Sequence, residues 1–193
     1  MALALFLTVP AAVAIGVLAS PLARAVALGE MATATGRTMI FVSLTTLSFG
    51  LVGEGLFVVG TNACYARRDA ISPFRSSLVR TVIVLCGMGV AFLLSGTPVL
   101  VALGVALSVS NLVGAAHLAN RLRTQLGPGD ERLTPSLRRA GVAAVLMAVP
   151  AWVIANGVPR LVAGRPGSLL GVAAAVVIGM AVFVGVQRSW RAP

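Results

Sequence analysis

The sequence predicts an all-α fold, a polytopic bundle of six transmembrane helices. The chain has 193 residues, of which 58% are hydrophobic and only 10% are charged. Soluble domains carry about a quarter charged residues. The mean hydropathy is +0.99, and the apolar residues are grouped in six long runs separated by polar linkers. We therefore expect a membrane protein whose residues 1–193 form a single transmembrane domain.

The six apolar runs set the positions of the expected spans. A helix needs about 20 apolar residues to cross a hydrocarbon core about 30 Å thick, because unpaired backbone groups are costly in lipid. The expected spans cover about residues 2–20, 39–62, 78–94, 98–120, 140–156 and 169–186. The first run has no basic residues before it and is longer than the apolar core of a secretory signal, so we interpret it as a span.

The distribution of arginine predicts the orientation of the chain. All fifteen basic residues are arginine. The loops after the second and fourth spans and the C-terminal tail hold eleven of them, and the opposite side holds four. Basic residues in short loops stay on the cytoplasmic side, so both termini are predicted to be cytoplasmic. The net charge is +10, but the basic residues lie between apolar runs and do not cluster on one soluble face, so no nucleic acid partner is expected.

The segment "YARRDAISPF", residues 65–74, is the expected cytoplasmic hairpin between the second and third spans. Pro73 disfavours helical geometry at Ser72, so we expect it to end the link and set the entry angle of the third span. Asp69 is expected to cap a helix or to pair with nearby arginines. Two interpretations remain open, a solvated turn and a role in gating or partner contact.

Glu54 is the one acidic residue inside an expected span, about 12 Å from its cytoplasmic end at 1.5 Å per residue. An ionisable group at such depth costs about 2.5 to 3.5 kcal/mol on insertion scales. At 100° per residue it shares a helix face with Ser43, Thr46, Gly50 and Thr61. Two interpretations of this face remain open. It borders a hydrated cavity, in which Glu54 pairs with an arginine or relays protons, or it packs on a neighbouring helix with Glu54 protonated.

The fourth span carries a second stripe of small and polar residues, Gly104, Ser108, Asn111 and Ala115. Small residues let membrane helices approach closely, so packing is the favoured role, although Asn111 is also a cavity candidate. Arg80, expected in the first turn of the third span, and His117, near the end of the fourth, are expected to snorkel to the interface. Glu54 is then the only charge expected deep in the membrane.

The sequence offers no candidate catalytic residues. It contains no carboxylate pair, catalytic triad, glycine-rich phosphate loop or metal-ligand spacing. Cys64 and Cys86 have no histidine or cysteine neighbours at ligand spacing and are expected to be packing residues. We therefore expect neither an enzyme nor a cofactor or metal site.

Several motifs together resemble the MurJ/MviN family of lipid II flippases, within the multidrug/oligosaccharidyl-lipid/polysaccharide exporter superfamily. The matching positions are Pro10, Ala11, Ala12 and Val13, then Gly50 and Leu51, then Tyr65, Asp69, Ser72 and Pro73. The resemblance covers the whole chain but corresponds to the last six helices of a fourteen-helix fold. Val84 and Met88 are apolar where some members carry sodium ligands, so no sodium site is expected.

This resemblance implies a function. The chain would be part of a lipid II flippase that translocates the lipid-linked peptidoglycan precursor across the bacterial inner membrane, with its last two spans forming a groove for the lipid tail. Its partners would be membrane lipids, the precursor, and a missing N-terminal transporter half that carries the cationic cavity. The alternatives are a related lipid-linked polysaccharide or drug exporter, and a truncated structural or regulatory membrane partner that does not transport.

Overall fold

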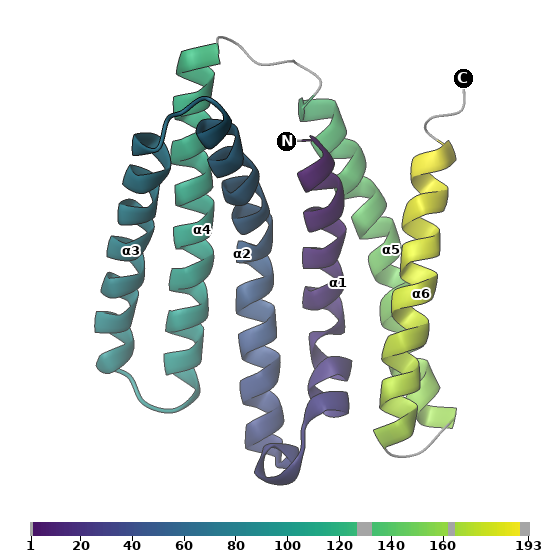
Figure 1. Cartoon of the computed structure of the whole chain (residues 1–193). Helices are drawn as coiled ribbons and strands as arrows, with labels where there is room; N and C mark the ends of the chain where they lie inside the picture. Colours follow the sequence, from purple (N-terminus) through teal and green to yellow (C-terminus); the bar gives the residue numbers. More distant parts are fainter. Residues whose placement is uncertain (1, 127–132, 162–164, 190–193) are drawn as a thin grey trace. The chain divides into compact units, whose positions relative to one another are not determined.

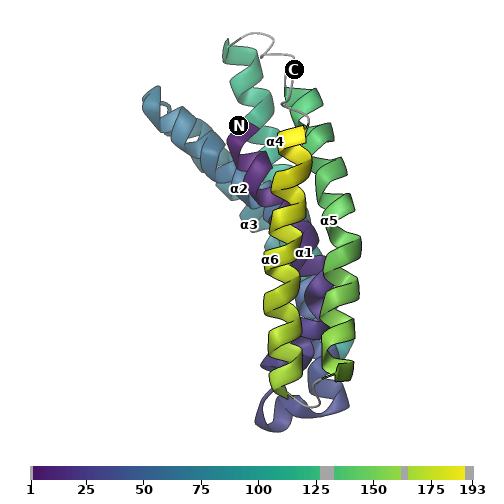
Figure 2. The ribbon, with the colours of Figure 1, turned by 90° about the vertical axis from the view of Figure 1, so that its right-hand side faces the viewer.

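The computed structural model describes residues 2–126, 133–161 and 165–189, and within these ranges its regular elements are all helical (Figures 1 and 2). The α-helices are α1 (Ala2–Val26), α2 (Ala34–Ala66), α3 (Ile71–Phe92), α4 (Thr97–Leu126), α5 (Leu133–Leu161) and α6 (Arg165–Ser189). A short 3-10 helix, η1 (Gly29–Ala32), lies between α1 and α2.

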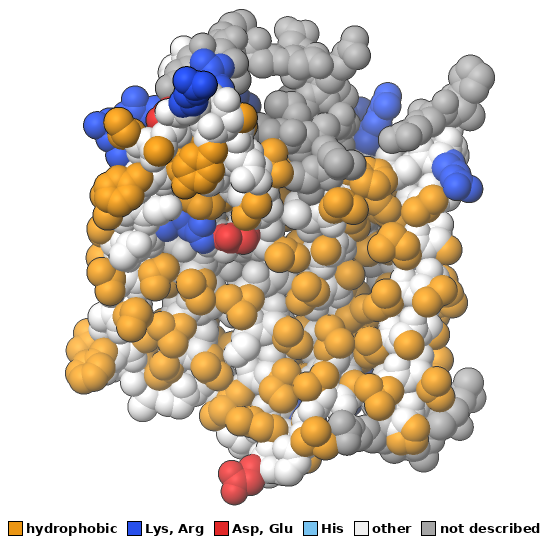
Figure 3. All heavy atoms as spheres, viewed as in Figure 1, with side chains coloured by type: hydrophobic (Ala, Val, Ile, Leu, Met, Phe, Trp, Pro, Cys, Tyr) orange, Lys and Arg blue, Asp and Glu red, His pale blue; other side chains and the backbone are white. Residues whose placement is uncertain are grey.

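All six α-helices are long and apolar enough to cross a membrane, by length and composition. This confirms the predicted all-α fold with six spans. Hydrophobic side chains lie along the outward faces of the helices in Figure 3, as expected for a protein whose solvent is lipid. The helices extend beyond the expected spans because they continue into polar flanking residues. Helix α4, for example, carries Arg123 in its last turn.

The chain divides into two compact units. Unit 1 comprises Met1–Thr8 and Thr46–Leu137, and unit 2 comprises Val9–Thr45 and Arg138–Pro193. Helices α1, α2 and α5 therefore each contribute residues to both units. The single transmembrane domain expected for residues 1–193 stays a prediction.

Unit 1 is built on the α3–α4 hairpin and the C-terminal part of α2. Its turn includes Gly96, whose φ of +70° is left-handed and favours glycine. The core joins α2 to α4 through Phe57, Cys64, Ala115, Leu118 and Leu122. Cys64 is thus a packing residue, as expected, whereas Cys86 is exposed and the same expectation is wrong for it, because its side chain lies on the outer surface of α3.

Unit 2 packs α1, α5 and α6 through small side chains. Leu18, Ala151, Ala155 and Ala175 form its core, and small residues let these helices approach closely. Figures 1 and 2 both show α5 and α6 running side by side. Near the end of α1, Arg24 Nη2 donates a hydrogen bond of 2.8 Å to Asn156 Oδ1 on α5.

The sidedness of the chain remains a prediction, and cysteine labelling tests it. In a variant without Cys64 and Cys86, single cysteines introduced at residues 67–75 and 124–136 should react only with reagents that reach the cytoplasm. Cysteines at residues 30–36 should react from outside intact cells, because four of the fifteen arginines are predicted to lie on that side. Labelling of residues 124–136 from outside would overturn this topology.

Candidate functional site between α2, α3 and α4

The hairpin between α2 and α3 is organised by Asp69. Its Oδ1 accepts hydrogen bonds from the backbone N–H groups of Ile71 (3.1 Å) and Ser72 (3.0 Å), and its Oδ2 accepts one from the Ser72 hydroxyl (2.7 Å). The first N–H groups of a helix have no intrahelical acceptor, and a carboxylate there also suits the helix dipole. Asp69 therefore caps α3, one of the two roles expected for it. Tyr65 is exposed on this hairpin.

The predicted start of the third span is wrong. Helix α3 begins at Ile71, seven residues before the expected residue 78, and Pro73 is its third residue. Proline is tolerated in the first turn because the N–H group it lacks would have no partner there. Ser72 and Pro73 thus lie in the first turn of α3, whereas Pro73 was expected to end the link before the third span and to disfavour helical geometry at Ser72.

This earlier start changes the place of Arg80. Counted from Ile71, Arg80 is about 14 Å along α3, near the middle of a 22-residue helix. It is neither in the first turn nor free to snorkel to the interface, so Glu54 is not the only charge deep in unit 1. The sequence does indicate this earlier helix start, because Asp69 is followed within four residues by Ser72 and Pro73, and an Asp shortly before a Pro is typical of a helix N-terminus.

Close packing of α2 on α4 positions the acceptors for Arg80. A Cβ on Gly50 would lie 2.7 Å from Ser108 Cα, and a Cβ on Gly53 would lie 2.7 Å from the Asn111 carbonyl carbon. Glycine at both positions therefore allows the backbones to approach. Polar groups join the same surfaces: the Ser108 hydroxyl donates to the Thr46 carbonyl (2.5 Å), and Asn111 Nδ2 donates to the Gly50 carbonyl (3.4 Å).

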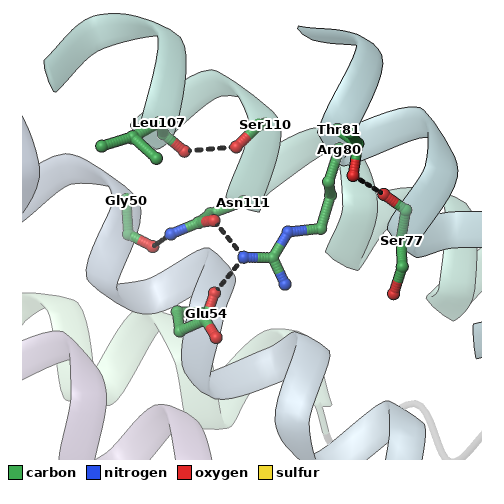
Figure 4. A network of polar contacts seen from close by, with 8 residues as sticks. All are labelled: Gly50, Glu54, Ser77, Arg80, Thr81, Leu107, Ser110 and Asn111. Atoms are coloured by element: carbon green, nitrogen blue, oxygen red, sulfur yellow. Dashed lines mark hydrogen bonds and ion pairs between the residues drawn. The ribbon is translucent and has the colours of Figure 1, made fainter. Parts of the chain in front are cut away.

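Arg80 bridges α2, α3 and α4 within unit 1 (Figure 4). Its Nη2 donates to Glu54 Oε2 on α2 and to Asn111 Oδ1 on α4, both at 2.5 Å. The guanidinium carbon lies 4.3 Å from the centre of the Phe57 ring, a cation–π contact. A Cβ on Gly114 would lie 2.5 Å from Arg80 Cγ and Cδ, so this glycine leaves the space that the side chain occupies.

The ion pair is only partly shielded. The Arg80 side chain is 22% exposed and that of Glu54 is 41% exposed. Of the roles left open for Glu54, pairing with an arginine is the one present in the structure. Whether its helix face borders a hydrated cavity stays a prediction.

A second polar contact joins α3 to α4. Ser76 Oγ lies 2.8 Å from His117 Nδ1 and also donates to the Ser72 carbonyl (3.1 Å). Which of the two side chains donates depends on the tautomer of the histidine. His117 was expected to snorkel, and the structure places it against a buried serine. Helix periodicity within one span could not reveal this contact, because it depends on the pairing of α3 with α4.

The structure brings together two of the four predicted cavity residues, Glu54 and Asn111, which meet at Arg80. Thr46 lies in the same unit but about two turns before Glu54 on α2, where its carbonyl accepts from Ser108, and Ser43 belongs to unit 2. Arg80 is the residue that sequence reasoning missed. Among the described residues, no group of three or more His, Cys, Asp or Glu side chains is placed to hold a metal ion.

A prediction follows for the cap of α3. Asp69→Ala should lower the free energy of unfolding of the purified chain by about 0.5 to 2 kcal/mol, the usual loss when a side chain that caps a helix N-terminus is replaced by alanine. Asp69→Asn keeps an acceptor oxygen and should retain most of the stability. Thermal unfolding in detergent measures both, and an alanine variant as stable as the parent would show that the three hydrogen bonds contribute nothing.

Comparison with known proteins gives a consistent result. The family model described as "Lipid II flippase MurJ" matches residues 1–178. Among solved structures, "Lipid II flippase MurJ, inward closed conformation" is similar in fold, with a TM-score of 0.75 and 14% sequence identity. The similarity covers 96% of this chain and 36% of that one, so the chain spans about a third of the solved protein. No curated protein sequence matches.

Proposed function

The chain belongs to the lipid II flippase MurJ family, and we propose that it forms part of a transporter that moves lipid II across the bacterial inner membrane. The observation that carries this proposal is the family match over residues 1–178. It favours a lipid II flippase over a lipid-linked polysaccharide or drug exporter. The fold similarity to a solved flippase supports the same architecture. The activity proposed for the protein is therefore transport rather than catalysis.

The remainder of the transporter is part of the proposal. The chain covers 36% of the solved flippase, and membrane transporters commonly work by rocking two helical bundles around a central site. We infer that an N-terminal portion supplies the other bundle and the main site for the charged headgroup. Membrane lipids and the lipid-linked precursor are the remaining partners.

The polar cluster of unit 1 gives the chain a mechanical role in this transporter. Arg80 ties α3 to α2 through Glu54 and to α4 through Asn111. A bundle that rocks as a rigid body needs such links between its helices, since the apolar surfaces of membrane helices have little preference for one another over lipid. We infer that α3, α4 and the adjoining part of α2 move together during transport.

Glu54→Gln tests this role in the complete transporter. Glutamine keeps the shape and one acceptor oxygen but removes the negative charge that balances Arg80, so lipid II export should fall while the protein stays abundant. Accumulation of lipid II in the outer leaflet measures export. Glu30→Gln is the matched control, because Glu30 is an exposed acid in η1. Normal export by Glu54→Gln would leave Glu54 as a packing residue.

A further inference from the structure

Arg80 has hydrogen-bond donors that the protein does not use. A guanidinium carries five N–H donors, and both contacts to Glu54 and Asn111 involve Nη2. Nε and Nη1 make no hydrogen bond to the described part of the chain, and both dashed contacts of Arg80 in Figure 4 start from the same nitrogen. A cation within a membrane span is costly unless its donors are satisfied, so these groups need an acceptor from outside unit 1.

The surroundings of Arg80 provide room for such an acceptor. Arg80 lines a pocket of about 300 Å³ together with the hydroxyl-bearing residues Ser77, Thr81 and Ser110. This volume is at the lower end of the range for ligand sites, about 300 to 1,000 Å³. The remaining lining residues are aliphatic and come from α3 and α4. The pocket thus combines one cation and three hydroxyl groups in an otherwise apolar wall.

The hydroxyl groups can also turn toward a ligand. The Thr81 hydroxyl donates to the Ser77 carbonyl (3.0 Å), and the Ser110 hydroxyl donates to the Leu107 carbonyl (2.8 Å). Both are local bonds to the residue's own helix, which Ser and Thr exchange readily. The Ser77 hydroxyl makes no hydrogen bond to the described residues, and its side chain is exposed.

We propose that Arg80 and the hydroxyl groups of Ser77, Thr81 and Ser110 form a binding site for a phosphoryl group within unit 1. A phosphoryl group offers three strong acceptor oxygens, which suits guanidinium N–H donors and hydroxyls that surround one pocket. Arginine is the side chain best matched to such anions, since it stays charged and presents several donors. This site goes beyond the proposed transport function, because it belongs to the isolated chain.

Glu54 gives the proposed site a distinctive property. Its carboxylate competes with the ligand for the charge of Arg80, since it accepts a hydrogen bond from Nη2 at 2.5 Å. Removing that negative charge should therefore strengthen binding of an anion. If the pair had only a structural role, Glu54→Gln would bind the anion more weakly, because loss of either partner would disorder the pocket.

Nitrogen-15 NMR of the arginine side chains tests the proposal on the purified chain in phosphatidylcholine nanodiscs. The Nε–H signal absent from Arg80→Gln identifies Arg80, and it is followed during two titrations, one with inorganic phosphate and one with phosphatidic acid added to the nanodisc lipid. Arg75→Gln is the matched control, an exposed arginine in the same helix. If Arg80→Gln does not fold, Arg80→Lys identifies the signal in its place, because it keeps the positive charge but lacks the planar set of donors.

The expected result is a saturable shift of the Arg80 signal in at least one titration. A shift with phosphatidic acid alone assigns the site to a lipid headgroup, and a shift with inorganic phosphate assigns it to a soluble anion. Glu54→Gln should bind about tenfold more tightly, and Arg75→Gln should bind as the parent does. No shift in either titration, or weaker binding by Glu54→Gln, would overturn the proposal, and neither outcome depends on whether the chain takes part in transport.

Discussion

Glu54→Leu will lower the free energy of unfolding of the detergent-solubilised chain by more than Arg80→Met does, and the double variant will recover most of the loss. The two residues form one ion pair across α2 and α3. Breaking a partly shielded pair leaves one charge without its partner, which costs more than replacing both residues by apolar ones. We expect a loss of about 2 to 3 kcal/mol for Glu54→Leu, below the 3 to 5 kcal/mol of a fully buried pair, because both side chains are partly exposed.

The difference between the two single variants has a chemical cause. Without Glu54, Arg80 stays charged, because a guanidinium does not lose its proton in proteins, and it keeps only Asn111 as an acceptor. Without Arg80, the charge left behind is the more exposed of the two, since the Glu54 side chain is 41% exposed and that of Arg80 is 22% exposed, so it costs less to leave unpaired. Arg80→Met should therefore lose about 1 to 2 kcal/mol.

A double-mutant cycle gives the measurement. Unfolding in denaturing detergent is compared for the parent, the two single variants and the double variant, with Arg75→Gln as the control. The coupling free energy should be about 3 kcal/mol, at the upper end of the range of about 0.5 to 3 kcal/mol for residues in contact, so that the double variant loses only about 1 kcal/mol. A double variant whose loss equals the sum of the two single losses would mean that the residues do not stabilise each other.

Much of the fold could be predicted from the sequence, because the lipid environment restricts the choices. Six apolar runs, each long enough to span a bilayer, leave helices as the solution, and the described residues contain six helices of that kind. The motif around Asp69 also points to its role, since the carboxylate lies where a cap is needed.

The site was harder to predict, because its central residue depends on where a helix begins. Hydropathy places the start of the third span where the apolar residues begin, but α3 starts seven residues earlier at a cap. That difference moves Arg80 from an interface to the middle of a helix. Its partners Glu54 and Asn111 come from two other helices, and their distances from Arg80 follow from the close approach of α2 and α4 at Gly50 and Gly53. Periodicity within one helix contains no information on such contacts.

Rescue of cells depleted of their lipid II flippase tests the central claim, that this chain is one part of such a transporter. Residues 1–193 alone should fail to restore growth and lipid II export. The chain covers 36% of the solved flippase, and rocking-bundle transport needs a second bundle around the substrate. Co-expression with the N-terminal portion of a family member, truncated where this chain begins to match, should restore both.

Outer-leaflet lipid II is the quantity to measure in that experiment, with the abundance of both polypeptides followed in the membrane. The account predicts that export returns only when the two polypeptides are present together, and that Glu54→Gln in this chain reduces it again. Export restored by residues 1–193 alone, or no export from two abundant polypeptides expressed together, would contradict it.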